Sequence, residues 1–236
     1  MTSPAVITIS GLQKNYSGLR PLRIRSLEIG AGERVALGGL DAVAAELLVN
    51  LVTGASLPDA GTVSVFAQST ADISDSDAWL TSLDRFGIVS PRAVMLEGST
   101  LEQNLALPFT LQIDAIEGEI QERIGRLAAD CGISRKDLSR QAGDLPAHVR
   151  LRAHLARAVA LDPVLLLVEH PTVEVSDAEK VPLARDVAAV AERRGIAALI
   201  ITTDVDFAEA VAHRSLALQP ATGDLVPWRK KRGWFR

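Results

Sequence analysis

The sequence has 236 residues, of which 47% are hydrophobic, and a formal net charge of −4. This length suits one domain, or one domain with an inserted subdomain, and the composition is that of a packed core rather than a disordered chain. No apolar run reaches the roughly 20 residues that span a bilayer, and MTSPAVITIS lacks the features of a signal peptide. A single cysteine, Cys131, excludes an internal disulfide, so we expect a cytoplasmic protein with a buried thiol.

Strand and helix patterns alternate along the chain, which predicts an α/β domain with a mainly parallel core sheet. Residues 6–9 and 22–29 alternate as antiparallel edge strands do, and further strands are expected at 35–37 and 62–66. The continuous apolar runs at 164–168 and 197–201 are typical of strands buried on both faces. An amphipathic helix is expected over residues 183–194, with Pro182 at its start and Gly195 just past its end.

The middle of the chain is helical and more polar. A helix is expected over residues 101–107, ending at Pro108, and another over 116–131, stopped by Gly132. We therefore expect a helical subdomain, about residues 90–160, inserted into a single domain that spans residues 1–226. Residues 227–236 form a separate tail.

The tail is basic and aromatic, whereas the rest of the chain is acidic. Its side chains suit a membrane–water interface, where each Lys or Arg gains about 1 kcal/mol near anionic lipid. They suit an acidic protein partner equally well, and a solvated, frayed tail is the third alternative. Nucleic acid is not expected as a partner, since the body of the chain is acidic. The residues concerned are Trp228, Arg229, Lys230, Lys231, Arg232, Trp234 and Phe235.

The segment GERVALGGLDAVAAELLVNLVTG has the frame of a phosphate-binding loop between a short apolar strand and a helix. Such a loop reads G-x-x-x-x-G-K-[ST]. Counted from Gly39, the second glycine, the lysine and the hydroxyl positions hold Ala44, Ala45 and Glu46. A hydrogen bond from the lost lysine would be worth roughly 1.5–3 kcal/mol, and a carboxylate ~4 Å from a phosphate costs about 4 kcal/mol. Micromolar affinity amounts to only about 8 kcal/mol, so ordinary nucleotide binding is not expected.

Six further segments follow one another in order, from residue 7 to about 225: ISGLQKNYSG, LPDAGTVSVFAQ, TLEQNLALP, LRAHLARAVALDPVLLLVEHPT, IITTDVDFAEAVAHRSLAL and TGDLV. Together they resemble the ATP-binding cassette (ABC) ATPase family. The resemblance implies a P-loop NTPase-like fold with a mainly parallel core sheet, an antiparallel N-terminal β-subdomain and an inserted helical subdomain.

At the family's functional positions this chain carries other residues. The resemblance implies that Tyr16 stacks on adenine, that Pro91 replaces the Mg²⁺-linked glutamine, and that Thr203 and Ser176 replace the switch histidine and the inter-subunit aspartate. The Asp–Glu pair of the family becomes Glu169 and His170. The LSGGQ-type motif falls on Leu145, Pro146, Ala147, His148 and Val149.

Some chemistry could survive these changes. Glu169 could hold a metal through water, and His170 could act as a base near neutral pH; the alternative is a strand-end residue with no catalytic role. Tyr16 could likewise be a packing residue. Arg150, His154 and Arg157 share a helical face, which is usually solvated or salt-bridged. No spacing typical of a metal site or of a nucleophile–base pair is present.

The leading hypothesis is a degenerate ABC ATP-binding subunit, catalytically impaired, that acts as a structural or regulatory partner of a membrane permease, of an intact ABC ATPase subunit, or of both. The resemblance implies a dimer on the inner face of the cell membrane, docked through the cleft near Pro91 to Glu102. No cofactor is expected, and ATP with Mg²⁺ would bind only at a residual site. The alternatives are a weakly active ATPase using Glu169 and His170, and a soluble binding module that reuses the fold.

Overall fold

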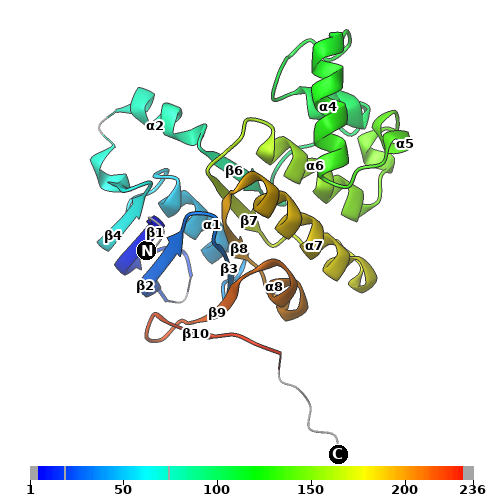
Figure 1. Ribbon diagram of the computed structural model, residues 1–236. Helices are drawn as coiled ribbons and strands as arrows, with labels where there is room; N and C mark the ends of the chain where they lie inside the picture. The colour runs from blue at the N-terminus through cyan, green and yellow to red at the C-terminus, as the bar shows by residue number, and fades with distance from the viewer. Residues whose placement is uncertain (1–4, 19, 74, 231–236) are drawn as a thin grey trace, which may run out of the picture.

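The computed structural model describes residues 5–18, 20–73 and 75–230. Two β-sheets occupy the left and centre of the view in Figure 1, and helices cover the central sheet and form the upper right lobe. None of the helices in these ranges is long and apolar enough to cross a membrane.

The first sheet is antiparallel and has the strand order β2-β1-β4-β5. Alternate side chains of β1 and β2 are buried, which explains the period-two pattern of the sequence. However, β1 pairs with both β2 and β4, so the prediction of an edge strand at residues 6–9 is wrong, whereas β2 does lie at the edge. The strands of this first sheet are β1 (Ala5–Lys14), β2 (Leu22–Gly30), β4 (Ala60–Val65) and β5 (Gln68–Ser69).

The second sheet is mainly parallel and has the order β10-β9-β3-β8-β7-β6. Only the pair β9–β10 is antiparallel among its neighbours. All residues of β3, β7 and β8 are buried, as their continuous apolar runs predict. Its strands are β3 (Arg34–Gly38), β6 (Phe86–Val89), β7 (Leu165–Glu169), β8 (Ala197–Ile201), β9 (Arg214–Gln219) and β10 (Asp224–Pro227).

The parallel sheet separates two hydrophobic cores. Leu166 and Val168 of β7 face the core shared with the large helices, whereas Leu165 and Leu167 face the core shared with helix α1 (Ala42–Val52) and the antiparallel sheet. Packing on both faces fixes the position of β7, and with it the polar residues Glu169 and His170 at its carboxyl end.

The helices cover both faces of the parallel sheet and build the upper right lobe (Figure 1). Helix α7 starts six residues before the predicted position, at Asp177, so Pro182 lies inside it; the acidic residues Asp177 and Glu179 favour that earlier start. The helices are α1 (Ala42–Val52), η1 (Thr70–Asp72), α2 (Ser76–Leu83), α3 (Leu101–Ala106), α4 (Gly118–Asp130), α5 (Arg135–Leu138), η2 (Ala142–Asp144), α6 (Ala147–Val159), α7 (Asp177–Arg194) and α8 (Val205–Val211).

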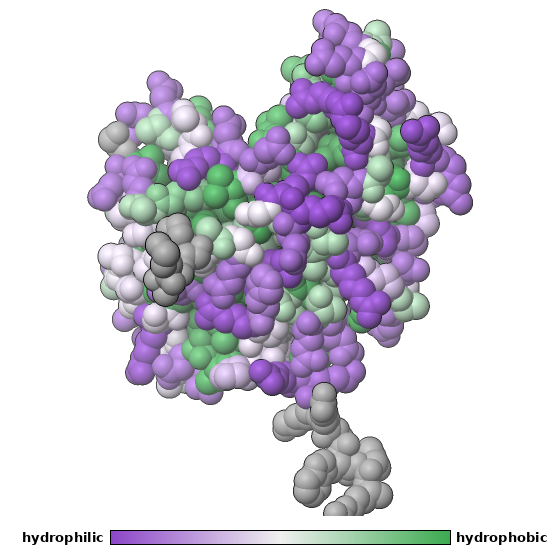
Figure 2. Space-filling model, in the orientation of Figure 1, coloured by the Kyte–Doolittle hydropathy of each residue, from purple (hydrophilic) through white to green (hydrophobic). Residues whose placement is uncertain are grey.

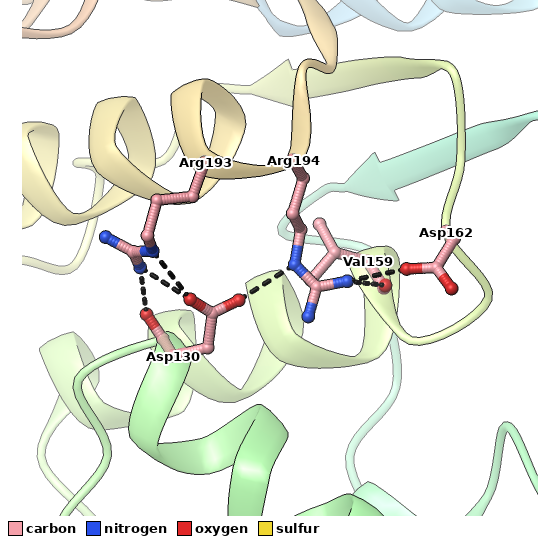
Figure 3. Close-up of polar contacts among 5 residues, drawn as sticks. All are labelled: Asp130, Val159, Asp162, Arg193 and Arg194. Carbon is pink, nitrogen blue, oxygen red and sulfur yellow. Dashed lines mark hydrogen bonds and ion pairs between the residues drawn. The ribbon is translucent and has the colours of Figure 1, made fainter.

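A cluster of ion pairs joins the end of α4 to the end of α7 (Figure 3). Asp130 accepts hydrogen bonds from Arg193 Nε at 2.8 Å and from Arg194 Nε at 2.8 Å. Arg194 also donates to the carbonyl oxygen of Val159 at 3.1 Å and to Asp162 at 2.8 Å. The upper right lobe is thus tied to the helices of the core. Next to it, Cys131 is fully buried, and burial, followed by the charge of Asp130, raises the pKa of its thiol to about 12.

Candidate functional site at the turn from β3 to α1

The backbone of the turn from β3 to α1 depends on a glycine. Gly39 has a φ of +85°, and a Cβ at this position would lie 2.8 Å from the carbonyl oxygen of Leu218. A side chain here would be strained and would clash with β9. Gly39 is therefore required by the backbone and its neighbours, independently of any ligand.

The first turn of α1 is capped by a carboxylate of the chain itself. Asp41 is the N-cap residue, and its Oδ1 accepts a hydrogen bond from the backbone N–H of Ala44 at 2.8 Å. Helix N-termini attract anions because their first N–H groups lack partners within the helix. In this chain an internal anion already satisfies one of those donors. Sequence reasoning missed Asp41, although Asp directly before a helical segment is a typical N-cap signal.

The three positions that differ from a P-loop lie in two environments. Ala44 and Ala45 are buried, at 5% and 0% exposure, and pack in the core shared with the antiparallel sheet. Glu46 points outward, with its side chain 48% exposed. The turn therefore presents no cation from these positions and one acidic side chain.

Glu46 and Glu169 share one arginine. The Arg92 guanidinium forms an ion pair with Glu46, and its Nη2 donates to Glu169 Oε2 at 2.7 Å. Ser90 Oγ donates to the same carboxylate oxygen at 3.2 Å. Arg92 follows Pro91, so the loop after β6 supplies this cation. Sequence reasoning did not identify Arg92, since no local pattern links it to positions far away in the chain.

His170 follows β7 in a strained backbone conformation. Its φ is +41°, and its N–H donates to the carbonyl oxygen of Ile201 at 2.8 Å. The side chain is buried, and within the described ranges its Nε2 has no hydrogen-bond partner. A cavity of about 80 Å³ lies beside it, lined in part by Pro91, Ala147 and Glu169. The structure thus gathers four of the predicted site residues around this small cavity.

Tyr16, predicted to stack on adenine, lines a different cavity of about 410 Å³. Gly39, Asp41 and Ala44 line the same cavity, together with Arg20 and Arg23. Burial, followed by the nearby Asp41 charge, raises the pKa of the Tyr16 hydroxyl.

The remaining predicted positions are spread over three turns. Leu145 is buried, Pro146 is the N-cap of α6, and His148 is half-buried in its first turn beside the buried Val149. Ser176 is the N-cap of α7, and Thr203 is exposed after β8. No group of three or more metal-binding side chains suited to a metal ion is present in residues 5–18, 20–73 and 75–230. The roles assigned to these positions stay predictions.

The face of α6 that carries two arginines and a histidine is largely paired. Arg150 donates to Glu174 at 3.0 Å, and Arg157 donates to the carbonyl oxygen of Val94 at 2.7 Å. Burial, followed by the charges of Arg157 and Arg150, lowers the pKa of His154 between them.

The first residues of the basic tail, Trp228 to Lys230, contact the rest of the domain. A Cβ on Gly38 would lie 2.8 Å from the ring of Trp228, and the Trp228 N–H donates to the carbonyl oxygen of Ser215 at 2.9 Å. Lys230 forms an ion pair of 2.8 Å with Asp206, while Arg229 is exposed. The tail residues Lys231, Arg232, Trp234 and Phe235 lie outside the described residues.

Solved structures identify the class of fold. The chain matches a dimeric bacterial ABC transporter cassette with a TM-score of 0.75 and 21% identity, over 97% of this chain and 100% of that one. It matches cbiO1 from Clostridium perfringens, part of the ABC transporter complex cbiONQ, with a TM-score of 0.77 and 18% identity, over 94% of this chain and 87% of that one. The fold is therefore that of the ABC ATPases, as the sequence predicts.

Sequence relatives agree with this fold. The chain is 26% identical over 221 residues to the aliphatic sulfonates import ATP-binding protein SsuB 3 of Paraburkholderia xenovorans (strain LB400), covering 92% of this chain and 78% of that protein. It is 27% identical over 199 residues to the lipoprotein-releasing system ATP-binding protein LolD of Chromohalobacter salexigens, covering 84% and 82%. Of the methionine import ATP-binding protein MetN of Brucella abortus (strain 2308), to which it is 24% identical, it spans only 58%. A scan against protein families finds no match. The resemblance to ABC transporter ATP-binding subunits is confirmed.

Proposed function

We propose that this chain is an ABC-type subunit that binds its partners without binding or hydrolysing ATP. The observation that carries the proposal is the Asp41 carboxylate on the N-terminus of α1, 2.8 Å from the Ala44 nitrogen. A triphosphate at this helix end would meet that negative charge and the charge of Glu46, and Ala45 offers no lysine to offset them. Two like charges ~4 Å apart near a protein surface repel by about 4 kcal/mol.

The catalytic positions support the same proposal. Glu169 is engaged by Ser90 and Arg92. The His170 ring is held in a buried position beside it, where a substrate water would have to enter a cavity of about 80 Å³. A base must reach the proton that it removes, directly or through one water. Both residues are buried, which supports a chain without turnover.

Phosphate release tests the absence of turnover. We expect the wild-type chain and Glu169→Gln to release phosphate from Mg²⁺-ATP at the same background rate. Turnover that Glu169→Gln abolishes, and that His170→Ala also lowers, would favour the weakly active ATPase instead.

The proposed docking surface is a groove between the upper right lobe and the upper left lobe, which carries α2 (Figure 1). The groove has a volume of about 400 Å³ and is lined by α2, β6, the end of α3 and α6. Ile88 and Leu161 line it with 39% and 55% exposure. Figure 2 shows hydrophobic surface at the base of the notch between these lobes. By resemblance to the family we propose a helical segment of a membrane permease as its occupant, with the chain at the inner face of the cell membrane.

The domain boundaries proposed with this function are those expected from the sequence: one domain over residues 1–226 with a helical subdomain at about 90–160. A dimer with a second ABC subunit is part of the proposal. Membrane contact through the tail would rest on Arg229 and the residues after Lys230, since Trp228 packs on Gly38 and Lys230 pairs with Asp206.

Membrane sedimentation tests the docking. Leu161→Asp places a charge in the groove, and Leu111→Asp is its matched control, because Leu111 is 88% exposed and lies outside the groove lining. With membranes from the source organism, we expect Leu161→Asp to lose association and Leu111→Asp to keep it. Equal association of both variants would count against the groove.

A further inference from the structure

One guanidinium joins three elements that are far apart in the sequence. Arg92 lies after β6, Glu46 lies on α1, and Glu169 ends β7. Both carboxylates contact the same side chain, Glu46 through Arg92 Nη1 and Glu169 through Nη2 at 2.7 Å. Arginine suits this position because its planar fork can contact two acceptors at once and keeps its charge at every physiological pH.

The bridge compensates a carboxylate that is removed from water. The Glu169 side chain is only 3% exposed. A buried charge is costly unless it is paired and hydrogen-bonded, and removing one partner of such a pair is strongly destabilising. Ser90 Oγ supplies a second donor to Glu169 Oε2, and the Arg92 N–H donates to Ser90 Oγ at 3.2 Å. The loop after β6 is therefore shaped around this carboxylate.

A magnesium ion does not fit between the two glutamates while Arg92 is present. The resemblance to the family implies a Mg²⁺ ion held near the positions of Glu46 and Glu169. Mg²⁺ requires a shell of oxygen ligands at about 2.0–2.1 Å. Here the carboxylate oxygens contact guanidinium nitrogens instead, and the described residues offer no group of three metal-binding side chains.

We propose that Arg92 is a built-in cation that takes the place of a divalent metal ion between Glu46 and Glu169. It holds α1, β7 and the loop after β6 together without metal or nucleotide. Replacing Arg92 by a neutral residue uncovers a site for a divalent cation formed by the two glutamates and Ser90. This inference deepens the proposed nucleotide-independent function by naming what replaces the metal.

The test uses Mn²⁺ as the probe, measured by electron paramagnetic resonance and by thermal unfolding with and without the ion. The variant is Arg92→Gln. Arg92→Lys keeps a positive charge at the site. Arg214→Gln is the matched control, because Arg214 also pairs with a glutamate, Glu33, at 2.6 Å but lies at the amino end of β9, whereas Glu169 lies at the carboxyl end of β7.

We expect Arg92→Gln to bind Mn²⁺ at least tenfold more tightly than the wild type, and its unfolding temperature to rise with the ion. The wild type, Arg92→Lys and Arg214→Gln should show no such response, and adding Glu46→Gln to Arg92→Gln should abolish it. Mn²⁺ binding by the wild type as tight as that of Arg92→Gln, or no gain in Arg92→Gln, would overturn the proposal.

If Arg92→Gln does not fold, the double variant Arg92→Gln/Glu169→Gln decides the question. It removes the buried carboxylate together with its cation, so we expect it to fold, and its failure to fold would overturn the role of Arg92. These outcomes are distinct from those that test the proposed function, since they concern Mn²⁺ and involve no nucleotide. A wild-type chain that bound ATP would contradict the proposed function whatever Arg92→Gln does with Mn²⁺.

Discussion

Asp41 caps α1 by accepting a hydrogen bond from the Ala44 N–H at 2.8 Å. The same helix end would have to receive a phosphate in a nucleotide-binding relative. Under the proposed function, this helix end is capped by a side chain of the protein itself and binds no phosphate.

Asp41→Ala is expected to destabilise the protein by about 1 kcal/mol, because an N-cap side chain is lost. Asp41→Ser is the control and should cost less than about 0.5 kcal/mol, since serine is also a good cap. Urea unfolding at neutral pH measures both. Equal stability of the wild type and Asp41→Ala would mean that the capping hydrogen bond is not formed in solution.

Asp130→Ala is expected to lower the free energy of unfolding by about 2 kcal/mol, because two arginines lose a charged hydrogen-bond acceptor. The control is Asp162→Ala. Asp162 is a different partner of Arg194, and the Asp162 side chain is 84% exposed. Exposed ion pairs contribute about 0–1 kcal/mol, so this variant should resemble the wild type. Similar losses of unfolding free energy in both variants would contradict a stabilising role of Asp130 between α4 and α7.

Acid sensitivity gives a second test of Asp130. Burial alone would raise the pKa of this carboxyl, but hydrogen bonds from Arg194 and Arg193 outweigh burial and lower it. Its stabilising contribution is thus complete above the unfolded pKa of about 4 and is lost as the pH falls through the lower folded pKa. Asp130→Asn should therefore lose less stability than the wild type on acidification below about pH 4. A steeper loss of stability in Asp130→Asn than in the wild type would show that the pKa of Asp130 is not lowered in the folded state.

His154 is expected to make the protein less stable as the pH falls below neutrality. Its pKa is lowered in the folded state by burial, then by Arg157 and Arg150, and is only partly raised by Glu174. Below the unfolded pKa of about 6.5 the unfolded chain binds the proton more readily, so unfolding is favoured. His154→Gln should flatten the stability profile between about pH 7 and 5. An unchanged profile in urea unfolding would exclude His154 as the group responsible.

Much of the fold could be predicted because buried parallel strands leave a clear mark in the sequence. The runs at 164–168 and 197–201 are apolar at every position. Residues 165–168 of β7 and all of β8 face a hydrophobic core on one side or the other, whereas Val164 precedes β7 and is 41% exposed. The position of β1 inside its sheet was not predictable in this way. A central antiparallel strand and an edge strand can share the same alternation when one face is covered.

The site was less predictable, because its central contacts are long-range. Asp41 could have been found from the local N-cap pattern, but Arg92 could not, since its partners Glu46 and Glu169 lie on other elements. The residues Ala44 and Ala45 predict the loss of a phosphate site, and this stays a prediction. Only the structure shows an arginine between the two glutamates.

Calorimetric titration of the wild-type chain with Mg²⁺-ATP, up to millimolar nucleotide, tests the central claim most directly. With Asp41 on the helix N-terminus and Arg92 between Glu46 and Glu169, we expect no heat beyond that of dilution. Saturable binding with a micromolar dissociation constant would contradict the account, because the capping carboxylate and the arginine bridge would then have to yield to the nucleotide.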